Sequence, residues 1–231
     1  MKLAAIDIGS NAARLLITEV NINEKGTPSF NKLNLIRVPL RLGFDVFESS
    51  EISKAKIGMV MQTMKAYKHL MNAYGVEHLK ACATSAMRDA KNAADIIRKI
   101  KMETDIGIEV ISGDLEANLI YENHVAENMD KDHSYLYIDV GGGSTELSFF
   151  SNYILTYKKS FNIGTIRLLK NMVTDKQWDD MKETLKAITK GHKEVVAIGT
   201  GGNINKVFSM SKRKDGKPLS LELLKDYYKE L

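Results

Sequence analysis

The residues best able to do chemistry lie together in residues 137–150, with the sequence YIDVGGGSTELSFF. An apolar run containing Asp139 is followed by three glycines and then by Ser144, Thr145 and Glu146, after which the apolar alternation resumes. This pattern predicts a strand, a tight turn and a second strand. Glycine lets the main chain approach a ligand and adopt positive φ, so the N–H groups of the turn can cradle a phosphate. The two carboxylates could hold a divalent ion against it.

A near-copy of this segment spans residues 3–20, in which an apolar strand ends at Asp7. The turn residues that follow are Gly9, Ser10 and Asn11. The two segments align as IDIGSN and IDVGGGST, and their separation of about 130 residues is too long for a solenoid repeat. A third glycine-rich turn follows an apolar strand within residues 195–207. We therefore expect two similar domains whose turns face one shared polyanion site.

Composition is that of an ordinary globular protein. The chain has 231 residues, 44% hydrophobic and 27% charged, with a net charge of +4, which suits one large domain or two modest ones. The single cysteine, Cys82, excludes an internal disulfide and a cysteine-based zinc cluster. No apolar run reaches the roughly 18 residues of a membrane helix. Because a strand begins at the N-terminus, we expect no signal peptide and a cytoplasmic location.

Positive charge is concentrated in residues 206–217, which hold five Lys or Arg and one Asp. Such a run is either a solvated loop or an electrostatic collar that attracts a polyanion. Elsewhere acids and bases nearly cancel, so we do not expect the chain to bind duplex nucleic acid.

Apolar periodicity predicts a first mixed α/β lobe, with the element order β-β-β-α-β-α-β-α, over residues 1–128. After the first hairpin a turn is expected at 21–30. The other predicted elements are strands at 34–40, 76–84 and 109–112 and helices at 53–74, 92–101 and 114–128.

A polar joint at 130–133 leads to a second lobe, predicted for residues 129–231. It repeats the β-hairpin and continues with a strand at 154–159, helices at 166–172 and 177–191, the third glycine turn and a helix at 220–231. The first lobe continues for longer after its corresponding strand, so we expect the second lobe to be incomplete at its C-terminus.

Five segments in order resemble the exopolyphosphatase and guanosine pentaphosphate phosphohydrolase family, within the actin, Hsp70 and sugar-kinase superfold. They are AIDIGSNAARLLI, CATSAMRDAKN, ISGDLEANLIY, IDVGGGSTEL and AIGTGGN. Turns of the DxG type occur throughout the superfold, whereas ATSAMRDAKN and ISGDLEA argue against its kinase and chaperone branches. The resemblance covers nearly the whole chain and implies two ribonuclease H-like (actin-like) lobes with a cleft between them.

The resemblance implies a hydrolase that cleaves terminal phosphoanhydride bonds of inorganic polyphosphate or pppGpp with water and Mg²⁺ or another divalent cation. Glu116 aligns with the family's glutamate base, and Arg88 and Arg14 with cations that face the transferred phosphoryl group. Asp139 and Glu146 are carried over as metal ligands, with Asp7 helping through water. The predicted phosphate-binding residues are Gly9, Ser10, Asn11, Arg14, Gly141, Gly142, Gly143, Ser144, Thr145, Gly199, Thr200, Gly201, Gly202 and Asn203.

Each of these side chains also has a purely structural interpretation. Asp7 and Asp139 could cap their turns, Glu116 could complement a helix dipole, and an arginine could form a surface ion pair. The chain departs from the family at Leu115, which replaces the first of two paired glutamates, and at Asn203, which replaces a threonine.

Two alternatives stay open. The departure at Leu115, together with the short C-terminus, keeps open a catalytically weak polyphosphate or nucleotide sensor of the same fold. The second alternative is an ATP-using member of the superfold, although the sequence has no recognisable adenosine pocket motif. Longer members of the family dimerise through added C-terminal domains, so the sequence leaves a homodimer open as well.

Overall fold

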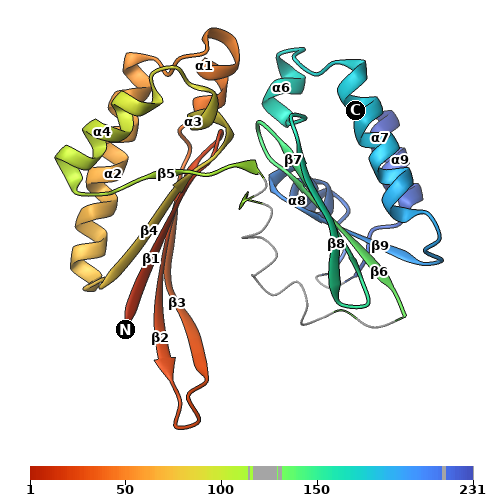
Figure 1. The fold of residues 1–231 in the computed structure, drawn as a ribbon, viewed down its shortest axis with the longest axis horizontal. Coiled ribbons are helices and arrows are strands. Elements are labelled where there is room, and N and C mark those ends of the chain that lie inside the picture. The colour runs from red at the N-terminus through yellow and green to blue at the C-terminus, as the bar shows by residue number, and fades with distance from the viewer. Residues whose placement is uncertain (114, 117–128, 130–131, 215–216, 231) are drawn as a thin grey trace.

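The computed structural model describes residues 1–113, 115–116, 129, 132–214 and 217–230. It shows two lobes side by side, each built on one β-sheet (Figure 1). The described elements of lobe 1 are β1 Lys2–Ile8, β2 Ala13–Ile22, β3 Pro28–Val38, α1 Leu42–Ser49, α2 Lys54–Tyr74, β4 His78–Ala83, α3 Ser85–Asp89, α4 Ala93–Thr104 and β5 Glu109–Val110. Those of lobe 2 are β6 Ser134–Val140, β7 Thr145–Ser151, β8 Ile154–Phe161, α6 Thr165–Leu169, α7 Asp175–Thr189, β9 Val195–Thr200, α8 Gly202–Met210 and α9 Leu221–Glu230.

The two sheets share one topology over four strands, to which lobe 1 adds β5 at its edge. Lobe 1 has the strand order β3-β2-β1-β4-β5 and lobe 2 the order β8-β7-β6-β9. In each lobe the first two strands form an antiparallel hairpin, and the first strand also pairs in parallel with the strand that follows a helix. The sequence repeat is therefore a structural repeat, and it places the turn after β1 and the turn after β6 at corresponding positions.

Helices cover one face of the sheet in lobe 1. The alternate residues Ile6 and Ile8 of β1 are buried in the same apolar cluster as Val60 and Met64 of α2. Asp7, between the two isoleucines, points to the opposite face of the sheet because strand side chains alternate. The core thus fixes which face of β1 carries the carboxylate.

Local signals set the ends of the main helices. The side chain of Ser53 caps α2 by accepting a hydrogen bond from the backbone N–H of Lys56, and Gly75 ends α2 in a left-handed conformation at φ 66°. In lobe 2, Thr174 and Gln177 form a reciprocal capping box at the start of α7.

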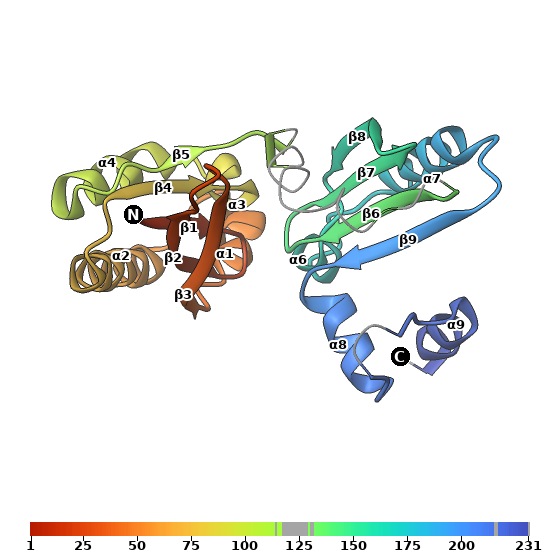
Figure 2. The ribbon, with the colours of Figure 1, turned by 90° about the horizontal axis from the view of Figure 1, so that it is seen from below.

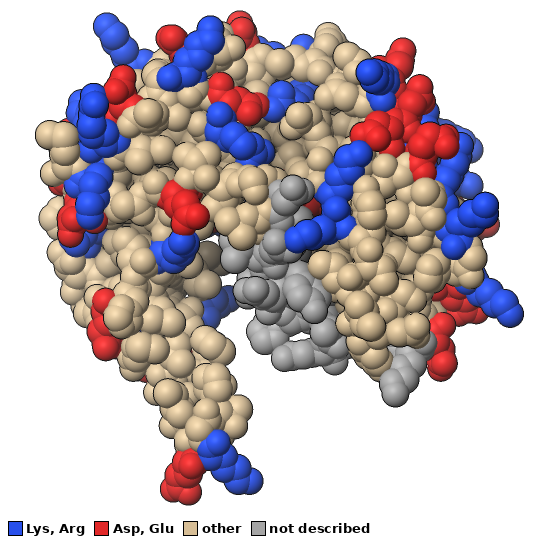
Figure 3. All heavy atoms as spheres, viewed as in Figure 1, with Lys and Arg blue, Asp and Glu red and all other residues tan. Residues whose placement is uncertain are grey.

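Seen from below, α8 and α9 extend away from the sheet of lobe 2 (Figure 2). On the face drawn in Figure 3, positive and negative side chains are interspersed over both lobes, as the near balance of charges in the sequence led us to expect. Within the described residues no helix is both long and apolar enough to cross a membrane.

The predicted mixed α/β architecture is confirmed, but several local predictions are wrong. β3 begins at Pro28, inside the predicted turn at 21–30, and the short helices α1 and α3 were not expected. Asn203, expected in a loop, lies in the first turn of α8. The predicted helix at 114–128 lies almost entirely outside the described residues.

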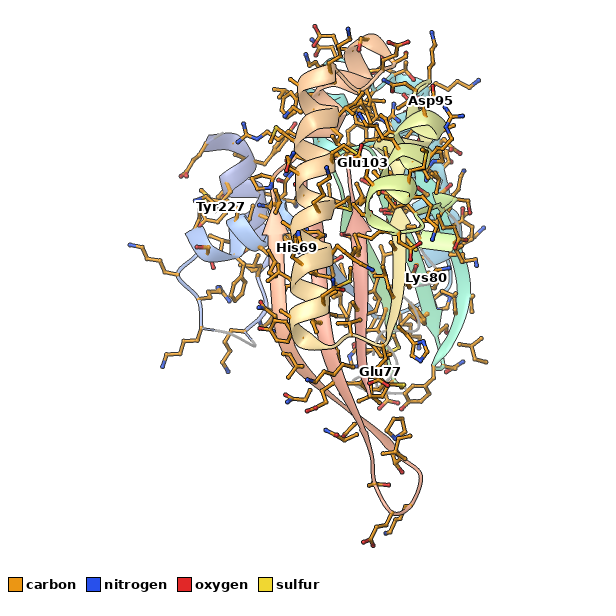
Figure 4. The ribbon with its side chains drawn as sticks, turned by 90° about the vertical axis from the view of Figure 1, so that its left-hand side faces the viewer. His69, Glu77, Lys80, Asp95, Glu103 and Tyr227 are labelled. Atoms are coloured by element: carbon orange, nitrogen blue, oxygen red, sulfur yellow. The ribbon has the colours of Figure 1, made fainter. Side chains whose placement is uncertain are left out.

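The outer side of lobe 1 carries a hollow of about 570 Å³ between α2 and α4. Figure 4 faces this side, with His69 on α2 and Asp95 and Glu103 on α4. An ion pair of 2.6 Å between Lys65 and Glu103 joins the two helices. The sheet separates this hollow from Asp7, so it is not part of the site described below.

Candidate active site

The first two glycine turns have the same backbone geometry. The N–H of Gly9 donates to the carbonyl of Ala12 at 3.0 Å, and the N–H of Gly141 donates to the carbonyl of Ser144 at 2.9 Å. None of the glycines in these two turns has a positive φ, contrary to our expectation; in the third turn Gly201 does, at 100°. At Gly142 and Gly143, glycine is therefore needed for a reason other than backbone conformation.

That reason is the close approach of the two lobes. A Cβ atom built on Gly142 would lie 3.2 Å from the Cβ of Ser10, in the turn of lobe 1. One built on Gly143 would collide with the Oγ of Ser85 and lie 2.6 Å from the Phe47 ring. Ser10 and Ser85 are themselves joined by a buried hydrogen bond of 2.7 Å. The two turns thus face each other across the junction of the lobes.

One pair of corresponding positions in the two hairpins, Arg14 and Glu146, carries opposite charges. Asp7 on β1 pairs in register with Arg14 on β2, and the two side chains form a salt bridge of 3.0 Å. In lobe 2, Asp139 on β6 pairs in register with Glu146 on β7. The position of Arg14 in lobe 1 is therefore that of Glu146 in lobe 2, and lobe 2 presents two acids where lobe 1 presents a neutral pair.

Glu146 is only 4% exposed. Burial raises its pKa, hydrogen bonds from Ser144 and Ser160 oppose that rise, and the charge of Asp139 adds to it. Like charges directly opposite on neighbouring strands destabilise a sheet. A pair of this kind is balanced when a cation lies between or beside the two carboxylates.

Glu116 adds a third acid from the segment that follows β5. Its Oε2 atom is buried and has no hydrogen-bond partner among the described residues. Burial and, next, the charge of Glu146 raise the pKa of Glu116 to about 8, with smaller contributions from Asp7 and Asp139, while Arg88 opposes the rise. Four carboxyl groups from both lobes therefore converge closely enough to affect one another.

Asp7 belongs to the same group. Burial raises its pKa, the salt bridge with Arg14 opposes the rise, and the charge of Asp139 in the other lobe adds to it. The carboxyl group of Asp7 therefore lies close enough to Asp139 for the two charges to interact across the junction.

Arg88 supports the segment that carries Glu116. Its Nη1 donates to the carbonyl of Ile111 at 2.7 Å, and its position in α3 is fixed by a backbone hydrogen bond of 3.0 Å to Thr84. The guanidinium has five N–H donors, so this bond leaves others for a ligand.

The third glycine turn abuts Asp139. Thr200 pairs with Asp139 in register, and a Cβ atom on Gly201 would lie 3.1 Å from the Oδ1 of Asp139. Gly202 and Asn203 begin α8 and are exposed. The part of this turn nearest to the carboxylate of Asp139 is thus Thr200 and Gly201, two residues or more before Asn203.

Sequence reasoning missed Arg167, which joins the lobes. Its Nε donates to the carbonyl of Gly143 at 2.7 Å, its guanidinium forms an ion pair with Asp89 of α3, and it lies 4.2 Å from the centre of the Phe47 ring. Its side chain is 11% exposed. A second ion pair, between Lys170 and Glu48, also crosses the junction. No periodicity or spacing of these residues indicated their pairing.

Ser85 and Ser160 were also missed as site residues. Ser85 lies inside the CATSAMRDAKN segment, so a signal was available, whereas Ser160 lies in a strand with no motif of its own.

The acids fit a divalent cation bound jointly with substrate. The described residues contain no cluster of three or more His, Cys, Asp or Glu side chains arranged to hold a metal ion. Asp139 and Glu146 nevertheless present two carboxyl groups in register on neighbouring strands, with hydrogen bonds from Ser144 and Ser160 supporting the ionised form of Glu146. Mg²⁺ is usually held by one or two carboxylates together with substrate phosphates and water, which is the donor set available here.

Comparison with known proteins agrees with this geometry. The model of the Ppx/GppA phosphatase family matches residues 21–213. The chain belongs to this family. It is 32% identical, over 203 residues, to a bifunctional 3-dehydroquinate synthase/phosphatase of Fusobacterium nucleatum, covering 80% of this chain and 30% of that protein. It is 27% identical to a guanosine-5'-triphosphate,3'-diphosphate pyrophosphatase of Vibrio vulnificus, covering 87% of this chain and 42% of that protein.

The crystal structure of an exopolyphosphatase from Cytophaga hutchinsonii superposes with a TM-score of 0.75 at 26% identity, covering 96% of this chain and 73% of that one. The predicted family and the predicted fold of two actin-like lobes are thereby confirmed. The chain spans less than half the length of the two curated relatives named above. The domain limits and the individual site residues stay predictions.

Proposed function

We propose that the site at the junction of the lobes hydrolyses the terminal phosphoanhydride bond of a linear phosphate polyanion, either inorganic polyphosphate or pppGpp. The observation that carries this proposal is the convergence of Glu116 with Asp7, Asp139 and Glu146 beside two facing glycine turns. Phosphoryl transfer requires positioning and charge neutralisation, with little covalent work from the protein. The family membership supports the same class of reaction.

Glu116 is the group suited to act on water. Its buried Oε2, which has no hydrogen-bond partner among the described residues, can accept the proton of an attacking water molecule when the carboxyl group is ionised. A pKa of about 8 lies near neutral pH, where a general base is most effective. The water oxygen bonds to the terminal phosphorus while the bond from that phosphorus to the bridging oxygen breaks. The shortened polyanion leaves with the electron pair of that bond, and the proton remains on Glu116.

Cationic and neutral donors are available for the phosphate oxygens. Arg14, which is half exposed, and Arg88 are the side chains best placed to neutralise the terminal phosphoryl group. The backbone N–H groups of the glycine turns can cradle the phosphates. Asp139 and Glu146 would hold a divalent cation, which supplies further neutralisation of the phosphate charge when it is bound.

Leu115 does not by itself favour the sensor alternative. Its side chain is 38% exposed and its backbone N–H bonds to the Ser112 side chain at 3.1 Å, so the segment keeps its turn without the family's first glutamate.

The test is phosphate release from polyphosphate and from pppGpp, measured side by side with Mg²⁺ and with EDTA. We expect Mg²⁺-dependent release, and we expect Glu116→Gln to abolish it while polyphosphate binding is retained. Glu222→Gln, an exposed acid on α9, is the matched control. Binding without turnover in the parent chain would favour the sensor, and unchanged turnover in Glu116→Gln would remove Glu116 from the mechanism.

A further inference from the structure

Ser160 contacts Glu146, one of the two acids that face each other on β6 and β7. It lies on β8 in register with Glu146 on β7, so the two side chains point to the same face of the sheet. Its hydroxyl donates to the Oε1 of Glu146 at 2.8 Å. Because Glu146 is buried, this bond fixes the direction of a carboxylate that has little access to water.

The other side of Ser160 meets the segment that carries Glu116. A Cβ atom built on Gly113 would lie 2.6 Å from the Cβ and 2.8 Å from the Oγ of Ser160. Gly113 does not have a positive φ, so its backbone conformation is open to other residues. Glycine is needed here because the backbone of Gly113 rests directly on Ser160.

The position of this backbone determines the position of Glu116. The N–H of Glu116 donates to the carbonyl of Ser112 at 2.9 Å, which closes one helical turn. Arg88 anchors the preceding residue, Ile111, through its carbonyl. A displacement of Gly113 away from Ser160 would therefore move the Glu116 side chain with it.

The repeat in lobe 1 provides an internal comparison. The residue of β3 that corresponds to Ser160 is Arg37, which pairs in register with Arg14 and is exposed. A long side chain is thus compatible with this position of the repeated sheet. The small hydroxyl side chain of Ser160 reflects its place between Glu146 and Gly113 and not a requirement of the fold.

We propose that Ser160 is a positioning residue that sets the geometry of both carboxylates, holding Glu146 through its hydroxyl and seating the Glu116 segment through its contact with Gly113. This inference rests on the proposed function for its catalytic meaning. The contacts themselves can be tested without turnover.

The first pair of variants separates the effect of the Ser160 hydroxyl group from that of the contact between Ser160 and Gly113. Ser160→Ala removes the hydrogen bond to Glu146 but keeps the Cβ atom under Gly113. We expect Mn²⁺, used as a probe cation, to bind about tenfold more weakly, because outer ligands of this kind orient metal-binding side chains. Ser134→Ala, which removes a hydroxyl bonded to His192 at the far end of the same sheet, is the matched control.

The second set tests the contact between Gly113 and Ser160 by first creating a collision between the two residues and then removing it. Gly113→Ala should lower kcat by about 100-fold, the scale expected when a catalytic group is displaced by about 1 Å. It should also raise amide hydrogen exchange in peptides covering residues 111–116. Adding Ser160→Gly to Gly113→Ala removes the colliding atoms, so exchange protection should return and kcat should rise to that of Ser160→Gly alone. Gly107→Ala, which has open space around it, is the control.

The outcomes distinguish this inference from the proposed function. If the parent chain hydrolyses neither substrate, the proposed function fails, while Mn²⁺ affinity and exchange still decide the role of Ser160. Unaltered amide hydrogen exchange in Gly113→Ala would refute the role of the contact between Ser160 and Gly113. A double variant in which neither exchange protection nor kcat recovers would refute it as well. If Ser160→Ala and the parent chain bind Mn²⁺ with equal affinity, the proposed role of the hydrogen bond from Ser160 to Glu146 is refuted. Should Gly113→Ala fail to fold, Ser160→Gly and Ser160→Ala still test both contacts.

Discussion

Replacing Glu116 with Gln should make the protein more stable at alkaline pH even as it removes activity. The pKa of Glu116 rises from an ordinary value of 4.5 to about 8, mainly through burial and secondly through the charge of Glu146. The folded protein therefore binds this proton more tightly than the unfolded chain does. The stabilisation that comes from this proton on Glu116 is fully present below pH 4.5 and is lost as the pH rises towards 8. Above pH 8 the contribution of Glu116 to the free energy of unfolding stays constant. Gln has almost the same shape and carries no charge.

The size of the effect follows from the two pKa values. Each tenfold change in proton affinity corresponds to about 1.4 kcal/mol, so between pH 5 and pH 9 the free energy of unfolding should fall by up to about 4 kcal/mol relative to Glu116→Gln. Relaxation of the site around a charged Glu116 would make the measured value smaller. Titrating groups far from Glu116 cancel in the difference, whereas Glu146, Asp7 and Asp139 titrate together with Glu116 and contribute to the measured change.

The assay is urea denaturation of both proteins at pH 5, 7 and 9 in EDTA, with the slopes compared to verify that the unfolding transitions are alike. EDTA matters because a divalent cation near Glu146 would lower the pKa of Glu116. A difference between the two proteins that stays constant within about 0.5 kcal/mol over this range, about an eighth of the predicted change, would refute the reasoning.

Two further predictions concern the junction of the lobes. Gly143→Ala should destabilise the protein by about 1–3 kcal/mol, since its methyl group would collide with Ser85, whereas Gly202→Ala, with open space around it, should not; equal denaturation midpoints would contradict this. Arg167→Lys should destabilise by about 2 kcal/mol, because a lysine keeps the charge beside Asp89 but cannot also bond the Gly143 carbonyl in the same geometry. A midpoint unchanged in Arg167→Lys would show that the junction does not depend on the guanidinium.

The repeat of the fold could be predicted from the sequence because a strand, a glycine turn and a second strand are local patterns. Asp7 and Asp139 stand at the same place in both copies, and the structure pairs them with Arg14 and Glu146 in the same register. The approach of the two turns was expected from this repeat.

What was not predictable depends on contacts between distant segments. Arg167 is 78 residues from Asp89, and Ser160 is 14 residues from Glu146, and neither pair has a spacing that periodicity would reveal. The short helices α1 and α3 bury several of their side chains. In addition, α1 begins after Arg41, whose backbone is left-handed at φ 54° and which provides no side-chain cap. Our explanation of the glycines by positive φ was wrong for the first two turns because steric room between lobes cannot be read from a single segment.

Ile166 gives the two lobes a shared folding unit. This residue of lobe 2 is buried within the apolar cluster of lobe 1, and its N–H donates to the carbonyl of Gly142 at 2.8 Å. Local opening of α6 would therefore expose core surface of lobe 1 and release the glycine turn of lobe 2 in the same event. We therefore expect the cooperative unit that protects the backbone amides of this turn from hydrogen exchange to include residues of both lobes, so that the order of the site depends on the stability of the opposite lobe.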